Sequence, residues 1–192
     1  MKILLINNHT VHLKHLTKAL AGHQIEIQKY EPGLKFNDQG KDLVILSGGG
    51  GEGLEIHDEY RPGQLWYDDE MSFIRSTDKP VVGICMGFEV IARAYGAPVT
   101  DVGRLILGRE EVRVGKPAKA LFGASKLSQY EAHSWRVQDV PSDFEVLATS
   151  RSGIEIFRYK DPKKTGKTII ASQFHPEKGG TLELKQLLAA VR

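Results

Sequence analysis

Short apolar runs, each bounded by polar or glycine-rich segments, dominate the first half of the chain. Residues 3–6, 43–46 and 80–84 are almost continuously apolar, as is typical of strands buried on both faces of a parallel sheet. Residues 24–29 alternate apolar and polar positions and predict one more strand. The first half therefore contains the strands of a parallel sheet.

Helical patterns separate these strands. We expect Thr10 to cap a helix that carries Leu13, Leu16 and Leu20 and to which Val11 also belongs. Further helices are expected over residues 66–76 and from Cys85 through Tyr95. This alternation predicts an α/β fold with three layers, in which a mostly parallel central sheet is flanked by helices.

The second half predicts additional antiparallel strands, because short alternating segments are separated by turn residues. These segments are 104–107, 110–114, 144–149 and 154–159. A strand is expected over 168–174 and a closing helix over 181–190, with an exposed hairpin turn over 160–167. With no repeat or linker in view, residues 1–192 are expected to form a single domain.

Composition excludes several classes of function. The formal net charge is +2, from 26 basic and 24 acidic residues that are interspersed, so no nucleic-acid partner is expected. No apolar run approaches the ~20 residues of a membrane span, and residues 1–6 are too short for a signal peptide. The chain is therefore expected in the cytoplasm, where its one cysteine is either an inert buried residue or a nucleophile.

The segment around that cysteine, residues 83–87 (Gly-Ile-Cys-Met-Gly), links a buried strand directly to a helix. This arrangement is the cysteine version of a nucleophile elbow, in which flanking glycines allow a sharp turn and close packing of helix on sheet. The partial positive charge of the helix N-terminus favours the thiolate. The alternative is a buried cysteine beside two incidental glycines.

Two further segments follow predicted strands. A thiol nucleophile needs a base and an acceptor that orients it, and His175 and Glu177 in residues 173–177 (Gln-Phe-His-Pro-Glu) supply both residue types. Residues 47–51 (Ser-Gly-Gly-Gly-Gly) could aim backbone N–H groups at an oxyanion, with the Met86 N–H as second donor. Taken singly, these segments also fit a surface turn and a flexible loop. Together they lie at the carboxyl ends of predicted parallel strands, where α/β sheets bind ligands.

Over nearly its whole length the chain resembles the class I (triad) glutamine amidotransferases, on residues 46–49, 83–87 and 173–177 in the order of that family. The resemblance implies a catalytic triad of Cys85, His175 and Glu177. It implies that the oxyanion donors are the backbone N–H groups of Gly49 and Met86. It also implies a glutamine substrate and no cofactor.

The resemblance extends to substrate binding but includes two departures. Residues 132–135 (Ala-His-Ser-Trp) are similar to a substrate-binding segment of the family and make Ser134 and Trp135 candidates for this role. Glu89, the third candidate for substrate binding, stands where the family usually has glutamine, and a Gly-Phe-Glu ending is similar to the γ-glutamyl hydrolases. The glycine run continues through Gly53, which suggests an oxyanion hole that is mobile until a partner or substrate orders it.

Three functions remain open. The first is a glutaminase subunit that supplies ammonia to a separate synthetase, and residues 130–137 with 144–148 favour the GMP synthase type. The second is a self-sufficient γ-glutamyl hydrolase, which Glu89 favours. The third is a non-catalytic interaction module. No metal is expected, because the histidines at a spacing of three, His9, His12 and His15, have no carboxylate ligand beside them.

Overall fold

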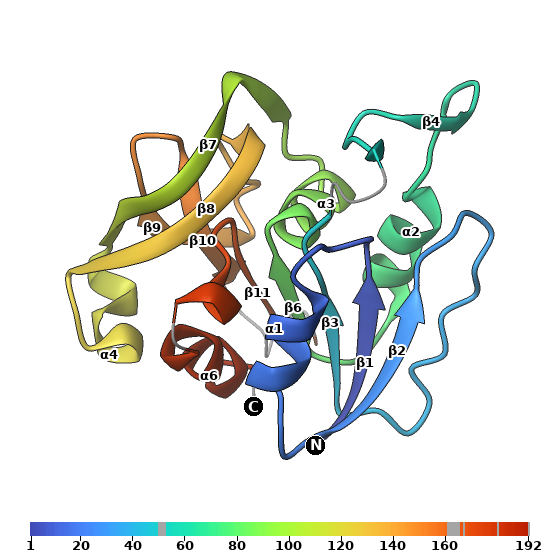
Figure 1. Cartoon of the computed structure of the whole chain (residues 1–192), viewed down its shortest axis with the longest axis horizontal. Coiled ribbons are helices and arrows are strands. Elements are labelled where there is room, and N and C mark those ends of the chain that lie inside the picture. Colours follow the sequence, from blue (N-terminus) through green and yellow to red (C-terminus); the bar gives the residue numbers. More distant parts are fainter. Residues whose placement is uncertain (50–52, 161–165, 167, 180, 192) are drawn as a thin grey trace.

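The computed structural model describes residues 1–49, 53–160, 166, 168–179 and 181–191. These residues form a nine-stranded sheet in the order β2-β1-β3-β6-β11-β10-β9-β7-β8, which curls at its β7-β8 end (Figure 1). Its strands are β1 (Lys2–Asn7), β2 (Gln24–Lys29), β3 (Leu43–Leu46), β6 (Val81–Ile84), β7 (Val99–Val114), β8 (Lys126–Val137), β9 (Phe144–Thr149), β10 (Ile154–Tyr159) and β11 (Ile169–Ser172). A separate short pair consists of β4 (Glu59–Arg61) and β5 (Gln64–Leu65).

Helices cover both faces of this sheet (Figure 1). They are α1 (Leu13–Ala19), α2 (Asp68–Ser76), α3 (Met86–Ala94), α4 (Lys119–Phe122) and α6 (Leu182–Ala189), together with the 3-10 turns η2 (Lys116–Ala118) and η3 (Pro176–Lys178). Within the described ranges, no helix is long and apolar enough to cross a membrane.

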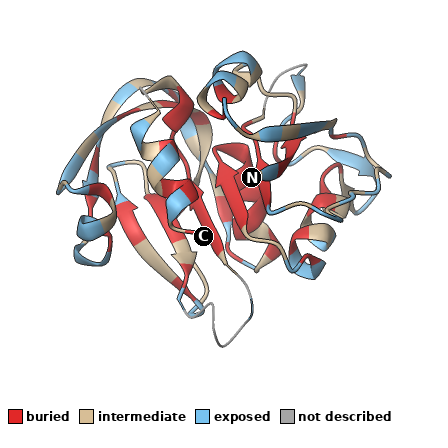
Figure 2. Cartoon of the chain, turned by 90° about the horizontal axis from the view of Figure 1, so that it is seen from below, coloured by how far each residue is buried: buried red, intermediate tan, exposed pale blue. Residues whose placement is uncertain are grey.

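Two cores lie on opposite faces of the sheet, because alternate residues of a strand point to opposite sides. In β1, Leu4 and Ile6 pack in the core under α2 and α3. Ile3 and Leu5 pack in the core under α1 and α6. Both sets are fully buried, and Figure 2 shows that burial is concentrated in the central strands. The three-layer arrangement predicted from the sequence is confirmed.

The two halves of the sheet differ in strand direction. Strands β2, β1, β3, β6 and β11 pair in parallel, whereas β10, β9, β7 and β8 are joined by antiparallel pairings. The predicted parallel core and its antiparallel additions are therefore both present. Residues 104–107 and 110–114 do not form two strands, because both belong to the sixteen-residue strand β7.

Two local predictions about the elements are wrong or incomplete. Thr10 does not cap α1, which begins at Leu13, and the Val11 side chain is 75% exposed. Instead, the Thr10 hydroxyl accepts a hydrogen bond from the His12 N–H at 3.1 Å within a turn. Strand β8 is not predicted from the sequence. The hairpin turn expected over 160–167 lies almost wholly outside the described residues.

A buried polar network joins the ends of β1 and β3 to α2. The Asn8 N–H donates to Ser47 Oγ at 2.9 Å, and Asn8 Nδ2 donates to Glu70 Oε1 at 2.9 Å. All three residues are fully buried. Burial raises the pKa of the Glu70 carboxyl to about 8, so this group is protonated at neutral pH.

We expect the Glu70→Gln variant to gain stability over the wild type as pH rises. In the unfolded chain the carboxyl ionises near its ordinary pKa of 4.5, while in the folded chain it keeps its proton up to about pH 8. Wild-type stability is therefore lost between these values, whereas the amide cannot ionise. Urea unfolding should show the variant gaining about 1–3 kcal/mol relative to wild type between pH 5 and pH 8.

The exposed Glu31→Gln variant is the control, and its free energy of unfolding should follow the wild-type pH dependence. Parallel pH profiles for wild type and Glu70→Gln would contradict the neutral, buried state of Glu70.

Candidate active site

Three neighbouring strands end at one edge of the sheet, and each is followed by one of the sequence motifs. Strands β3, β6 and β11 are parallel neighbours. Ser47 follows β3, Cys85 follows β6, and His175 is the third residue after β11. Gly49, Cys85 and His175 line one cavity of about 260 Å³ at this edge. Such a volume suits a ligand of amino-acid size rather than a large one.

Cys85 lies at a strained turn between β6 and α3. Its φ of 50° and ψ of −108° are unusual for a residue with a side chain and cost about 1–3 kcal/mol. The surrounding packing enforces this conformation. A Cβ on Gly87 would lie 2.5 Å from the Leu46 carbonyl oxygen, and one on Gly83 would lie 2.7 Å from the Gly87 oxygen. Only glycines let α3 approach β3 and β6 this closely.

The Cys85 thiol is buried in acidic surroundings. Its pKa is raised well above the usual value, mainly by burial and then by the charges of Glu89, Glu131 and Glu177. The Met86 N–H acts in the opposite direction, because it donates a hydrogen bond that favours the thiolate. The thiol therefore carries its proton at neutral pH, and a base must remove it before the sulfur can attack.

His175 has the surroundings of such a base. Its Nδ1 lies 2.8 Å from Glu177 Oε1, and both side chains are buried. A carboxylate only accepts hydrogen bonds, so Nδ1 carries the ring hydrogen and Nε2 keeps a lone pair. The His175 backbone N–H donates a hydrogen bond to the Tyr130 backbone carbonyl oxygen at 2.9 Å. This bond connects the His175 loop to β8.

The glycine loop after β3 packs against the turn at Cys85. A Cβ on Gly48 would lie 2.8 Å from His175 Cε1, and one on Gly49 would collide with the Met86 side chain. Gly49 and Met86 both line the cavity. Residues 50–52, on which the expectation of a mobile oxyanion loop rests, lie outside the described residues.

Glu89 lines the cavity from the first turn of α3. Its Oε1 accepts a hydrogen bond from Gln173 Nε2 at 2.8 Å. Burial raises the pKa of the Glu89 carboxyl to about 7, and this hydrogen bond acts in the opposite direction. The cavity thus contains a buried acid that titrates near neutral pH.

Ser134 and Trp135, on β8, also line the cavity. The Trp135 ring packs against His57 with centroids 5.1 Å apart, and Trp135 Nε1 donates to Glu55 Oε2 at 3.4 Å. The segment that includes residues 54–57 therefore covers one side of the cavity, a role that the residue pattern alone did not establish.

Two further residues that line the cavity, His12 and His133, were not predicted as site residues from the sequence. The His12 ring meets the His175 ring edge-on at 4.8 Å. Burial, followed by the nearby His175 and Lys178 charges, lowers the pKa of His12 to about 4, so its imidazole is neutral. The position of His12 in the segment after β1 could have indicated that it lies at the site, because β1 ends at the same edge of the sheet as β3.

Comparison with known proteins identifies the family of this chain. The class I glutamine amidotransferase family profile matches residues 4–191. A glutamine-hydrolysing GMP synthase subunit of Methanobrevibacter smithii is 27% identical over 95% of this chain and 92% of that protein. The protein of the same name from Methanothermobacter thermautotrophicus is 29% identical over 94% of this chain and 91% of that protein.

Solved structures show the same fold. A glutamine amidotransferase of Thermotoga maritima superposes with a TM-score of 0.72 at 20% identity, over 99% of this chain and 81% of that one. A chain from Thermoplasma acidophilum gives a TM-score of 0.75 at 22% identity, over 100% of this chain and 94% of that one. With the family profile spanning nearly the whole sequence, the chain belongs to the class I glutamine amidotransferase family.

Proposed function

We propose that residues 1–192 act as one domain, the glutaminase subunit of an amidotransferase, in the cytoplasm. It hydrolyses the side-chain amide of L-glutamine to glutamate and ammonia, and no cofactor enters these steps. One observation carries the proposal. Cys85 at its strained turn shares a small cavity with His175, whose ring is held by Glu177 at 2.8 Å.

The first half of the reaction forms a thioester. His175 Nε2 takes the thiol proton, and Cys85 Sγ attacks the carbonyl carbon of the glutamine side chain. The Gly49 and Met86 N–H groups stabilise the oxyanion, and one such donor contributes about 3–4 kcal/mol in similar sites. His175 then gives the proton to the departing nitrogen, the C–N bond breaks, and ammonia leaves.

The second half releases glutamate. His175 takes a proton from water as the water oxygen attacks the thioester carbon, and the same oxyanion donors are used again. The C–S bond then breaks, and the sulfur recovers its proton from His175. Glu177 keeps the imidazole oriented and stabilises its charged form in both halves.

The fate of the ammonia is inferred from the relatives. This chain spans 92% and 91% of the length of the two GMP synthase subunits, from M. smithii and M. thermautotrophicus. Their names describe one subunit of a glutamine-hydrolysing GMP synthase. We therefore propose that ammonia from this chain goes to a separate synthetase subunit of the GMP-forming type.

A self-sufficient γ-glutamyl hydrolase is the second candidate, and the carboxyl of Glu89 in the cavity favours it. A glutamine side chain at this position has both a donor and an acceptor, whereas an ionised glutamate only accepts. This difference changes which substrates the site holds, but it leaves the chemistry at Cys85 the same.

Replacing Cys85 with alanine should lower glutamate release from L-glutamine by about 10⁴-fold or more, because the nucleophile is lost. The assay compares L-glutamine with a panel of larger γ-glutamyl compounds. The exposed Ser142→Ala variant is the control and should keep wild-type rates. Residual activity of Cys85→Ala near that of wild type would refute the mechanism. A preference of the wild type for the larger compounds would support the hydrolase instead.

A GMP-forming synthetase subunit from the same organism should raise the glutaminase rate of the purified chain tenfold or more. Amidotransferase sites of this kind depend on closure by a partner or substrate, which completes the catalytic arrangement. The measurement is glutamate release with and without the synthetase and its own substrates. Full activity of the chain alone, unchanged by the synthetase, would contradict its assignment to a two-chain enzyme.

The KM for L-glutamine should fall as pH rises from 6 to 8, through the Glu89 pKa of about 7. Below this value the carboxyl is neutral, and above it the carboxylate attracts the α-ammonium group of the substrate. In Glu89→Gln this part of the pH dependence should be lost. A KM profile that is the same in both proteins would show that Glu89 does not contact the charged end of glutamine.

A further inference from the structure

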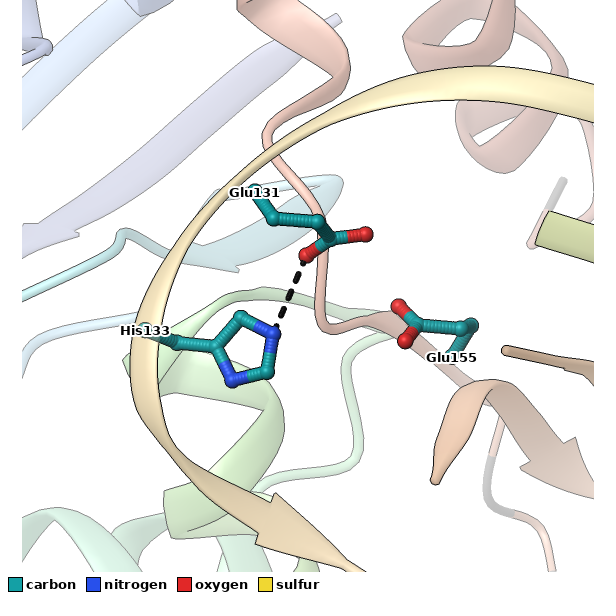
Figure 3. Close-up of side chains that lie close together, drawn as sticks. All are labelled: Glu131, His133 and Glu155. Carbon is teal, nitrogen blue, oxygen red and sulfur yellow. Dashed lines mark ion pairs between the residues drawn. The ribbon is translucent and has the colours of Figure 1, made fainter. Parts of the chain in front are cut away.

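Three buried side chains outside the proposed triad point toward one another between β8 and β10 (Figure 3). Glu131 and His133 are two residues apart on β8, so they face the same side of the strand, and Glu155 faces them from β10. Their ligand-type atoms all lie within 4.8 Å of one another. His133 Nε2 and Glu131 Oε2 are 3.3 Å apart.

These groups converge without the hydrogen bonds that buried polar atoms normally have. The three residues are only 1%, 5% and 1% exposed, in chain order. Among the described residues, both Glu131 carboxyl oxygens, His133 Nε2 and Glu155 Oε2 have no hydrogen-bond partner when the two carboxyls are ionised. Buried polar atoms without partners are costly, so these four need either shared protons or a cation between them.

The orientation of the His133 ring shows what kind of occupant fits. Its Nδ1 lies 2.6 Å from the Trp135 carbonyl oxygen, which can only accept, so Nδ1 carries the hydrogen. Nε2 then presents a lone pair to the oxygen of Glu131. The Ser150 hydroxyl donates a hydrogen bond to Glu155 Oε1 and so helps to orient that carboxyl, whose Oε2 has no such donor. Lone pairs facing one another need either shared protons or a cation between them.

We propose that Glu131, His133 and Glu155 bind one divalent metal ion of the zinc type. One imidazole nitrogen and two carboxylate oxygens form a donor set that zinc accepts, and water can provide the fourth ligand. In a tetrahedral site with bonds of about 2.1 Å, ligand atoms lie ~3.4 Å apart. The Glu131–His133 separation of 3.3 Å already matches, and the Glu155 oxygen, within 4.8 Å of both atoms, would move closer on binding.

The contact of the other His133 ring nitrogen also matches those of metal-binding histidines. A metal-binding histidine generally donates its other ring N–H to a carbonyl or carboxylate, as His133 does to the Trp135 oxygen. At neutral pH without metal, protons remain on the carboxyls, because burial raises the pKa of Glu131 to about 8 and that of Glu155 well above its usual value. Metal binding therefore displaces protons and tightens with rising pH.

A bound ion would act on the position of β8. It would join β8 to β10, and β8 carries Ser134 and Trp135 on the cavity wall. Metal binding itself does not depend on the glutaminase proposal, and either can fail without the other.

The test measures zinc binding to the chelator-treated full chain. The Cys85→Ala background is used because a thiol and the histidines near it could hold zinc by themselves. Competition with a chromophoric chelator should give one zinc ion per chain. Glu155→Gln in this background should weaken binding 100-fold or more, whereas the exposed Glu111→Gln should leave it unchanged.

X-ray absorption on zinc-loaded Cys85→Ala protein gives a second readout that needs no cluster variant, in case Glu155→Gln does not fold. The expected first shell contains one imidazole and otherwise oxygen ligands. Two or more imidazoles would place the ion at the other histidines and overturn the proposal. Absence of binding in the background protein, or equal binding by a folded Glu155→Gln, would show that protons alone fill the cluster.

Discussion

The close approach of α3 to β3 is the constraint on which the site depends. It is possible only because Gly87 lies against the Leu46 carbonyl, where a Cβ would be 2.5 Å from the oxygen. With the helix this close, the turn before it cannot relax, and Cys85 is held at a φ of 50°. This strained backbone conformation costs about 1–3 kcal/mol, which the burial of the two apolar cores on the faces of the sheet offsets. The position of the sulfur is therefore a property of the whole fold.

The surroundings of that sulfur determine when it can react. Burial is the largest factor that favours the protonated thiol, and the carboxyls of Glu89, Glu131 and Glu177 act in the same direction when they are ionised. A free thiolate in this cavity would thus be costly, which protects the group from unproductive reactions between turnovers. In the mechanism proposed above, Glu177 stabilises proton transfer to His175, so the charged thiolate–imidazolium pair forms as the sulfur attacks. We therefore expect the Cys85 thiolate to form only together with the imidazolium of His175.

The sequence was sufficient for features that depend on local patterns. The buried runs identified the parallel strands closely, and the motif glycines indicated the turn at Cys85. Strand β8 was missed because its buried positions include Gln129, Glu131 and His133, which have no apolar pattern. Their burial arises only when the curled sheet brings β8 over the ends of the parallel strands. For the same reason Glu155, which lies on a different strand, could not be grouped with them from spacing.

Strand β8 links features of the site that are far apart in sequence. The backbone carbonyl of Tyr130 accepts a hydrogen bond from the His175 N–H. Ser134 and Trp135 line the cavity. Glu131 belongs to the cluster that includes a residue of β10. A shift of this one strand would move the His175 loop, the cavity wall and the Glu131 carboxyl together. Because β8 is antiparallel and lies at the edge of the sheet, β7 alone among the described strands holds it by a strand ladder. The contacts it makes across the curl, to the His175 loop and to the Glu155 cluster, are therefore the ones that set its position over Cys85.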